Sequence, residues 1–125
     1  MKLVYGTGNK SKIMTMKKHV AALGLEILSL DDVSALDIDI DESGKNPLEN
    51  ARIKARAYYN ALNMPVFSCD SGMYVDGLDD ARQPGVHVRR INGRRLNDDE
   101  MMAYYSALAT EFGGSITARY IMPYA

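Results

Sequence analysis

Short extended runs alternate with helical stretches along this chain, and this alternation restricts the possible folds more than any other feature. Runs rich in β-branched, aromatic and aliphatic residues at 2–5, 25–30 and 65–69 have the length and composition of strands. Stretches with the 3–4 apolar spacing of a helix separate them, at about 10–23 and from 47 to 62. Strands that alternate with helices predict an α/β domain.

Capping residues mark where the helices begin. The run Asn46–Glu49 supplies an N-cap, Pro at the first helical position and Glu at the third, which is close to a capping box. Asn97 and Glu100 repeat the pattern and predict a third helix that ends at Phe112. The predicted buried stripe of the helix after Asn46 consists of Leu48, Ala51, Ala55, Tyr58 and Leu62.

The last predicted strand covers residues 115–122. Apolar and polar residues alternate there, which predicts a strand with one buried face. The expected fold class is therefore α/β, with a mixed β-sheet flanked by helices.

Composition limits the class of protein. A length of 125 residues predicts one domain over 1–125 that is large enough for a hydrophobic core. A formal net charge of -1 argues against general nucleic-acid binding. No apolar run approaches the roughly 20 residues of a membrane span. A single cysteine, Cys69, fits a reducing compartment, so we expect a cytoplasmic protein with no membrane partner.

The first candidate site is the turn GTGNKSK at residues 6–12, between a predicted strand and a predicted helix. Its glycines expose backbone N–H groups at a helix N-terminus, which is a suitable environment for phosphate. The spacing is not that of a P-loop. An ordinary strand-to-helix turn with a solvated lysine pair is the alternative interpretation. The side chains that could donate to a phosphate are Thr7, Asn9, Lys10, Ser11 and Lys12.

The second candidate is the acidic run DIDIDESG at residues 37–44. Asp37, Asp39 and Asp41 alternate with isoleucines, so they share one side of an extended segment, and Glu42 follows. Carboxylates gathered in this way can hold Mg²⁺. The alternative is a solvated acidic edge that discourages aggregation.

The third candidate lies at the start of the second predicted helix. Asn50 and Lys54 are four residues apart, so they share a helix face near its N-terminal turn. Lys54 could meet a phosphate there, with the helix dipole acting in the same sense. The alternative is that Glu49 and Lys54 are ordinary charged residues on the protein surface.

The fourth candidate is the sequence Asp70-Ser71-Gly72 directly after a buried strand. A carboxylate at the end of a rigid strand suits a general base or a metal ligand, and glycine allows close approach of a substrate. The alternative is an Asp-Ser-Gly turn in which Asp70 bonds to its own backbone.

Taken together, these pieces resemble the inosine triphosphate pyrophosphatase family, which removes deaminated purine nucleotides. The resemblance covers residues 1 to about 122. The matching segments are TGNKSK at 7–12, ESGKNPLENARIKA at 42–55, CDSGMYVDGL at 69–78 and PGVHVRR at 84–90. Their order and spacing make the combination specific, although each segment alone is a weak signal.

The resemblance implies an activity and a set of site residues. The activity is Mg²⁺-dependent hydrolysis of ITP, dITP or XTP to the monophosphate and pyrophosphate, in a protein that is commonly a dimer. Asp70 would be the general base, and Glu42 and Asp70 would bind the metal. The substrate-binding residues implied are Thr7, Asn9, Lys12, Asn50, Lys54, Ser71, Gly72 and Arg90.

Two departures from the family pattern lead to an alternative. Cys69 stands where the family has the first acid of an Asp-Asp pair, so the negative charge around Asp70 is lower. The chain also lacks a match to the family's Gly-Phe-Gly-Tyr-Asp and Ser-His-Arg segments, so we expect the C-terminal part of the family fold to be missing. The alternative is a nucleotide- or phosphate-binding relative without catalysis.

Overall fold

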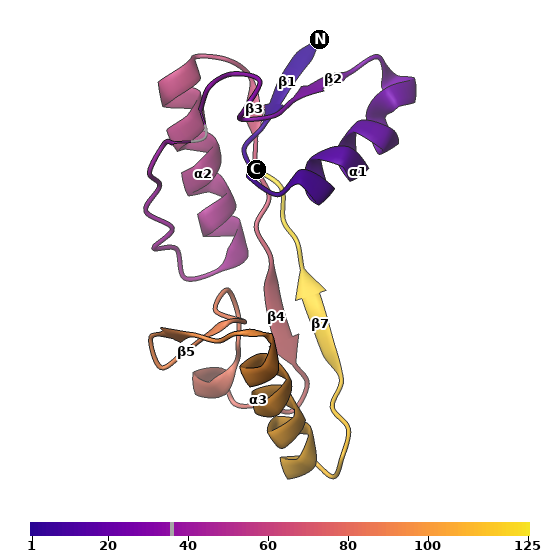
Figure 1. Cartoon of the computed structure of the whole chain (residues 1–125), viewed down its shortest axis with the longest axis vertical. Coiled ribbons are helices and arrows are strands. Elements are labelled where there is room, and N and C mark those ends of the chain that lie inside the picture. Colours follow the sequence, from indigo (N-terminus) through magenta and orange to yellow (C-terminus); the bar gives the residue numbers. More distant parts are fainter. Residues whose placement is uncertain (36) are drawn as a thin grey trace. The chain divides into compact units, whose positions relative to one another are not determined.

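The computed structural model describes residues 1–35 and 37–125, which form two compact units (Figure 1). Unit 1 comprises Met1–Asp70 and Met122–Ala125, and unit 2 comprises Ser71–Ile121. The expectation of a single domain over 1–125 stays a prediction. Within the described ranges, no helix is both long enough and apolar enough to cross a membrane.

A parallel sheet of three strands forms the centre of unit 1. Its strands are β1 (Lys2–Tyr5), β2 (Glu26–Leu28) and β3 (Val66–Phe67), in the order β2-β1-β3. These strands were expected from the sequence, and β2 and β3 are shorter than predicted. The last residues of the chain return to this unit, where Ser68 and Ala125 exchange two backbone hydrogen bonds of 2.7 and 2.9 Å.

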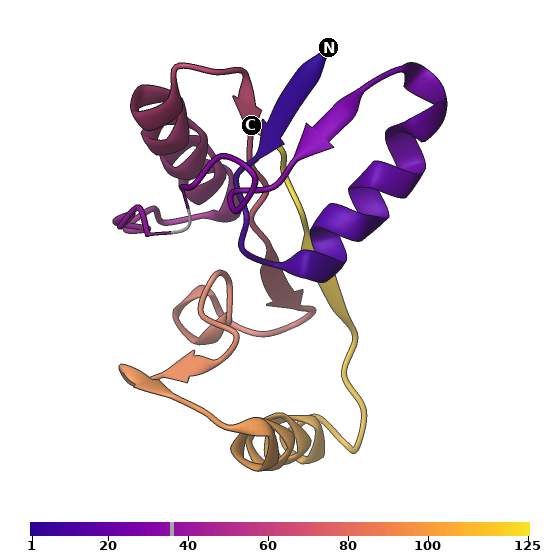
Figure 2. The ribbon, with the colours of Figure 1, turned by 45° about the horizontal axis from the view of Figure 1, so that its top comes forward.

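Two helices cover the two faces of this sheet (Figure 2). Neighbouring residues of a strand point to opposite faces. Accordingly, Val4 packs in a cluster with Tyr58 of α2 (Pro47–Leu62), whereas Tyr5 packs in a cluster with Ile13 of α1 (Lys10–Val20). Unit 1 is therefore a helix–sheet–helix arrangement, and the α/β fold class is confirmed.

Capping residues fix the ends of these two helices, and Asn46 is the one predicted from the sequence. The Asn46 side chain accepts a hydrogen bond from the Glu49 N–H, and Asn9 caps α1 in the same way. A 3-10 turn extends α1 to Leu23, where Gly24 ends it with a φ of 70°. Asn63 ends α2 in the left-handed conformation.

The predicted buried stripe of α2 is wrong at one residue, Leu48. Leu48 is exposed, whereas Pro47, Ala51 and Tyr58 are buried. Each residue turns a helix by about 100°, so a stripe that passes through position 47 leaves position 48 well off the buried face.

Unit 2 contains two antiparallel strand pairs, one α-helix and a 3-10 turn (Asp80–Arg82). Strand β4 (Gly72–Val75) pairs with β7 (Ala118–Ile121), and β5 (Arg90–Ile91) pairs with β6 (Arg94–Arg95). Helix α3 (Asp98–Glu111) begins with the predicted capping box between Asn97 and Glu100. The buried core of this unit consists of Val75, Leu78 and Leu108.

The prediction of a half-buried last strand is wrong. All four residues of β7 are exposed, and Tyr120 retains 61% of its accessible surface. Strand β7 forms a two-stranded sheet with β4, and the buried cluster of unit 2 is built from β4, the turn after it and α3. An alternating sequence indicates a strand, but its apolar side is buried only if another layer covers it.

Candidate functional site

The turn at residues 6–12 connects β1 to α1 as the sequence predicted. Gly6 is needed where it stands, because a Cβ there would lie 2.7 Å from the ring of Tyr58. The Gly6 N–H donates to the Phe67 carbonyl at 2.8 Å, and its own carbonyl accepts from the Ser68 hydroxyl at 2.7 Å. These contacts tie the turn to the end of β3.

Two predicted phosphate ligands also hold the turn together. The Thr7 hydroxyl accepts from the Asn9 N–H at 3.1 Å, and the Asn9 side chain accepts from the N–H groups of Ser11 and Lys12. The side-chain oxygens of Thr7 and Asn9 thus stabilise the turn itself, as expected for an ordinary strand-to-helix turn. The Thr7 hydroxyl and the Asn9 amide keep their own hydrogens for donation to an anion, and the positive end of the α1 dipole lies at the same place.

A lysine and two carboxylates form the charged centre of unit 1. The Lys54 ammonium lies 3.6 Å from an Asp70 oxygen and 4.0 Å from a Glu42 oxygen, and it donates to the Cys69 carbonyl at 2.9 Å. The side chains of Lys54 and Asp70 are only 12% and 19% exposed, whereas Glu42 is 46% exposed. Three residues predicted independently from three segments therefore meet in one cluster, which we call the Lys54 cluster.

Asn50 holds the loop that carries Glu42. Its side chain is buried, and its carbonyl oxygen accepts from the Gly44 N–H at 2.8 Å. A Cβ at Gly44 would lie 2.5 Å from that oxygen, so only glycine permits this approach. Asn50 positions the acidic loop beside Lys54, and its predicted contact with substrate stays a prediction.

The acidic run itself is only partly in the cluster. Asp37, Asp39 and Asp41 are exposed, whereas Ile38 and Ile40 pack against the core beside α2. The predicted alternation is confirmed, and Glu42 is the acid of this run that reaches Lys54.

Cys69 is a packing residue in this environment. It is fully buried beside Tyr5, Ile13 and Ile27. Burial raises the pKa of its thiol, and the positive charges of Lys12 and Lys54 oppose that shift. The hydrogen bond from Lys54 to the Cys69 carbonyl places the Lys54 cluster at this residue.

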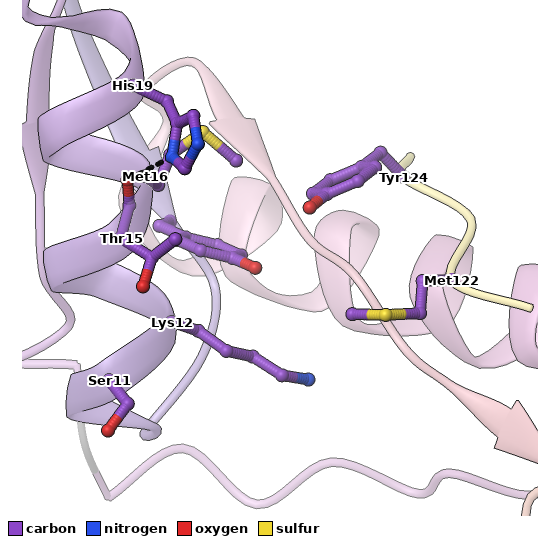
Figure 3. Close-up of a pocket in the computed structure, with 8 residues that line it drawn as sticks. Ser11, Lys12, Thr15, Met16, His19, Met122 and Tyr124 are labelled. Atoms are coloured by element: carbon purple, nitrogen blue, oxygen red, sulfur yellow. Dashed lines mark hydrogen bonds between the residues drawn. The ribbon is translucent and has the colours of Figure 1, made fainter. Parts of the chain in front are cut away.

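A cavity of about 380 Å³ opens along one face of α1 (Figure 3). Ser11, Lys12, Thr15 and His19 of α1 supply its polar side chains, and methionine and tyrosine side chains form the rest. Burial raises the pKa of Tyr5, which stacks on Phe67 with ring centroids 4.4 Å apart. A lysine beside a flat apolar wall can accept a ligand with an anionic end and a planar ring. The full lining is Tyr5, Ser11, Lys12, Thr15, Met16, His19, Met122 and Tyr124.

The remaining predicted site residues lie in unit 2. Ser71 follows Asp70 directly, Gly72 is the buried first residue of β4, and Arg90 is exposed on β5. The structure thus brings Glu42, Lys54 and Asp70 together in unit 1, and Arg90 belongs to the other unit.

Some residues of the site were missed by reasoning from the sequence. Gly44 and Ser68 both hold loops at the site through the bonds described above. A glycine just before a helix cap was a usable signal for Gly44. Ser68 gave no signal, because a serine within a short strand is commonplace.

The donor set of the Lys54 cluster fits a hard divalent cation. Mg²⁺ is commonly bound through one or two carboxylates together with phosphate oxygens. Glu42 and Asp70 supply two carboxylates beside one ammonium, which leaves a net negative cluster. Within residues 1–35 and 37–125, no three His, Cys, Asp or Glu side chains gather as a cage.

The fold and the site define an α/β protein with a glycine-containing turn at the end of β1 and a lysine–carboxylate cluster just after the neighbouring strand β3. The chain belongs to the Ham1 family, whose model matches residues 3–122. It is 36% identical over 118 residues to a dITP/XTP pyrophosphatase of Rhodopseudomonas palustris, covering 94% of this chain and 54% of the relative. A dITP/XTP pyrophosphatase of Campylobacter jejuni is 37% identical over 111 residues, covering 82% of this chain and 53% of that protein. These matches confirm the resemblance seen in the sequence.

Solved structures agree with the fold. A HAM1 protein from Coxiella burnetii matches with a TM-score of 0.76 and 25% identity, covering 98% of this chain and 62% of that one. The Staphylococcus aureus Ham1 protein matches with a TM-score of 0.73 and 20% identity, covering 100% and 70%. The chain spans about half the length of the curated relatives it matches.

Proposed function

We propose that this chain is a nucleoside triphosphate pyrophosphatase that converts ITP, dITP or XTP to the monophosphate and pyrophosphate with Mg²⁺. The observation that carries the proposal is the Lys54 cluster, in which an ammonium and two carboxylates meet at a strand end. The names of the relatives, dITP/XTP pyrophosphatases, support the choice of substrate.

Asp70 is the proposed general base. Its carboxylate is largely buried, and it lies three residues after the end of β3, directly after Cys69, whose backbone forms a β-bridge with Tyr124. Its position is therefore fixed by paired backbone rather than by a free loop. A carboxylate held in this way can orient a water molecule and accept its proton while the oxygen attacks the α-phosphorus. The bond from the α-phosphorus to the bridging oxygen breaks, and pyrophosphate leaves.

The lysines are the proposed phosphate ligands. Lys54 provides a positive charge close to Asp70, and Lys12 provides a second one at the N-terminus of α1. Positive groups fixed near the phosphates stabilise charge that develops on them during the reaction. The other proposed substrate-binding residues of unit 1 are Thr7, Asn9 and Asn50. Those of unit 2 are Ser71, Gly72 and Arg90.

Glu42 and Asp70 are the residues that would hold Mg²⁺. A bound Mg²⁺ would neutralise charge on the phosphate oxygens. We also propose a cytoplasmic protein, as the single cysteine indicates, that forms a homodimer, as the resemblance implies.

The test is pyrophosphate release from ITP, dITP, XTP, GTP and ATP, with and without Mg²⁺. We expect metal-dependent release from the first three, and loss of at least about a hundredfold in Asp70→Asn, because removal of a general base typically costs that much. Asp76→Asn is the matched control, since Asp76 is an exposed aspartate of unit 2. In water enriched in ¹⁸O, the label should enter the monophosphate. Label in pyrophosphate, or near-normal turnover by Asp70→Asn, would refute the mechanism.

A second candidate is nucleotide binding without catalysis, and Cys69 favours it. An apolar, buried thiol replaces the acid that the family carries next to Asp70. Binding of ITP with no release of pyrophosphate at any metal concentration would select this candidate.

A further inference from the structure

The hairpin of β5 and β6 carries four arginines in seven residues, which is the densest positive charge of the chain. Asn92 and Gly93 form its two-residue turn with φ angles of 51° and 76°, as a type I′ turn requires. The turn fixes the register, in which Ile91 pairs with Arg94 and Arg90 pairs with Arg95.

One face of the hairpin is neutralised by α3. Arg89 donates to Asp98 at 2.7 Å, and Arg94 donates to Glu100. Ile91 and Leu96 lie on the same face, and a cavity of about 560 Å³ joins them to Glu100, Ala103 and Tyr104 of α3. Figure 1 shows β5 next to the first turn of this helix. Two of the four positive charges are therefore used within unit 2.

The other face carries Arg90 and Arg95. Side chains alternate along a strand, so the residues between those that face α3 point the opposite way. Arg90 and Arg95 are directly opposite each other and exposed. Like charges at directly opposite positions destabilise an antiparallel pair. Among the ion pairs of the described residues, neither guanidinium has a carboxylate partner.

From this arrangement we infer that Arg90 and Arg95 form an anion-binding clamp for a phosphate group with two or more ionised oxygens. An anion between the two guanidinium groups would convert their repulsion into two attractive pairs. Each guanidinium can donate two parallel hydrogen bonds to phosphate oxygens, so two of them match a di- or polyanion such as pyrophosphate or a triphosphate tail. A phosphodiester has one charge for each phosphate and fits less well.

For its choice of anion the inference rests on the proposed function, but its test does not depend on turnover. In protein labelled with ¹⁵N-arginine, the side-chain Nε signals are followed while inorganic pyrophosphate is added. Signals are assigned from Arg90→Gln, Arg94→Gln and Arg95→Gln. We expect the signals of Arg90 and Arg95 to shift together, and that of Arg94, which is paired with Glu100, to stay in place.

The affinity measured by these shifts should fall about tenfold in Arg95→Gln, because one charge-assisted donor pair is lost. It should change less than about twofold in Arg94→Gln, the matched control on the other face of the hairpin. Absence of shifts at Arg90 and Arg95, or equal shifts at all four arginines, would overturn the clamp. Pyrophosphate release in the wild type would survive that result, so the two proposals fail separately.

A single-stranded oligonucleotide is the second arm of the titration. Weaker shifts than those with pyrophosphate would support the assignment to a small polyanion. Shifts of Arg90 and Arg95 with the oligonucleotide and none with pyrophosphate would overturn it in favour of a nucleic-acid backbone.

Discussion

Lys54 is the side chain whose replacement tests the site most directly, because it contacts three partners while being 12% exposed. The variant Lys54→Met keeps the length of the aliphatic stem and removes only the charge and the donors. It leaves the Cys69 carbonyl without its donor and Asp70 without its cation.

The size of the effect follows from these contacts. A hydrogen bond from a charged donor contributes about 1.5–3 kcal/mol. The ion pair with the partly buried Asp70 adds about 0.5–1 kcal/mol, and the pair with the more exposed Glu42 adds little. Freeing the ordered lysine side chain returns about 1 kcal/mol of entropy. We therefore expect Lys54→Met to lower the free energy of unfolding by about 2 kcal/mol, which corresponds to about 8 °C in Tm.

Urea unfolding followed by circular dichroism measures this quantity. The slope with urea should be unchanged, because the surface exposed on unfolding is the same. Lys45→Met, at an exposed lysine just before α2, should change the free energy of unfolding by less than about 0.5 kcal/mol. A double-mutant cycle with Asp70→Asn should give a coupling of about 0.5–1 kcal/mol. A loss below about 0.5 kcal/mol for Lys54→Met, or zero coupling, would refute the cluster as a stabilising contact.

Three further predictions test other parts of the molecule. Gly44→Ala should lower the free energy of unfolding by about 1–3 kcal/mol, because its Cβ would collide with Asn50; chemical denaturation measures the loss. Burial raises the pKa of Tyr105 from 10.0 to about 12, so the folded state keeps a proton that the unfolded state loses. Stability should therefore fall as the pH rises from 10 to 12, by about 1–2 kcal/mol more in the wild type than in Tyr105→Phe. Arg95→Glu should raise the free energy of unfolding by about 0.5 kcal/mol, because it places an opposite charge across from Arg90.

Each of these has its own control. Gly8→Ala should be close to neutral, since a Cβ there meets nothing within 4 Å; a large loss would mean that any change in the turn is harmful. Parallel pH profiles of wild type and Tyr105→Phe would contradict the raised pKa of this tyrosine. For the hairpin, Arg94→Glu should lower the free energy of unfolding, because it sets a like charge against Glu100. An increase in the free energy of unfolding for Arg94→Glu would contradict the charge-pairing explanation given for Arg95→Glu.

The sequence predicted the local elements well because their signals are local. The Asn46 and Asn97 caps and the turn at residues 6–12 depend on neighbours within a few residues. Burial depends on distant partners, and there the predictions were less accurate. Leu48 is one position away from the buried face of α2, and β7 alternates like a half-buried strand although no layer of unit 2 covers it.

The candidate site follows the same division. That Glu42, Lys54 and Asp70 would meet was suggested by the resemblance, since they lie on three separate segments. The bond from Gly44 to Asn50 could not be read from the sequence, because it depends on how a loop folds back onto a helix. The separation of Arg90 from Arg94 depends on the pairing register, which the Asn92-Gly93 turn encodes.

The return of the chain end to unit 1 has a consequence for how the protein folds. Ser68 and Ala125 exchange backbone hydrogen bonds, although the whole of unit 2 intervenes between them in the sequence. Closing so long a loop in a disordered chain costs conformational entropy before any contact forms. The pairing of Gly72 with Ile121 holds the two ends of unit 2 together, so a folded unit 2 shortens that loop to a few residues. Unit 2 should therefore gain its structure first, and mutations that weaken β4–β7 pairing should slow the final closure of unit 1.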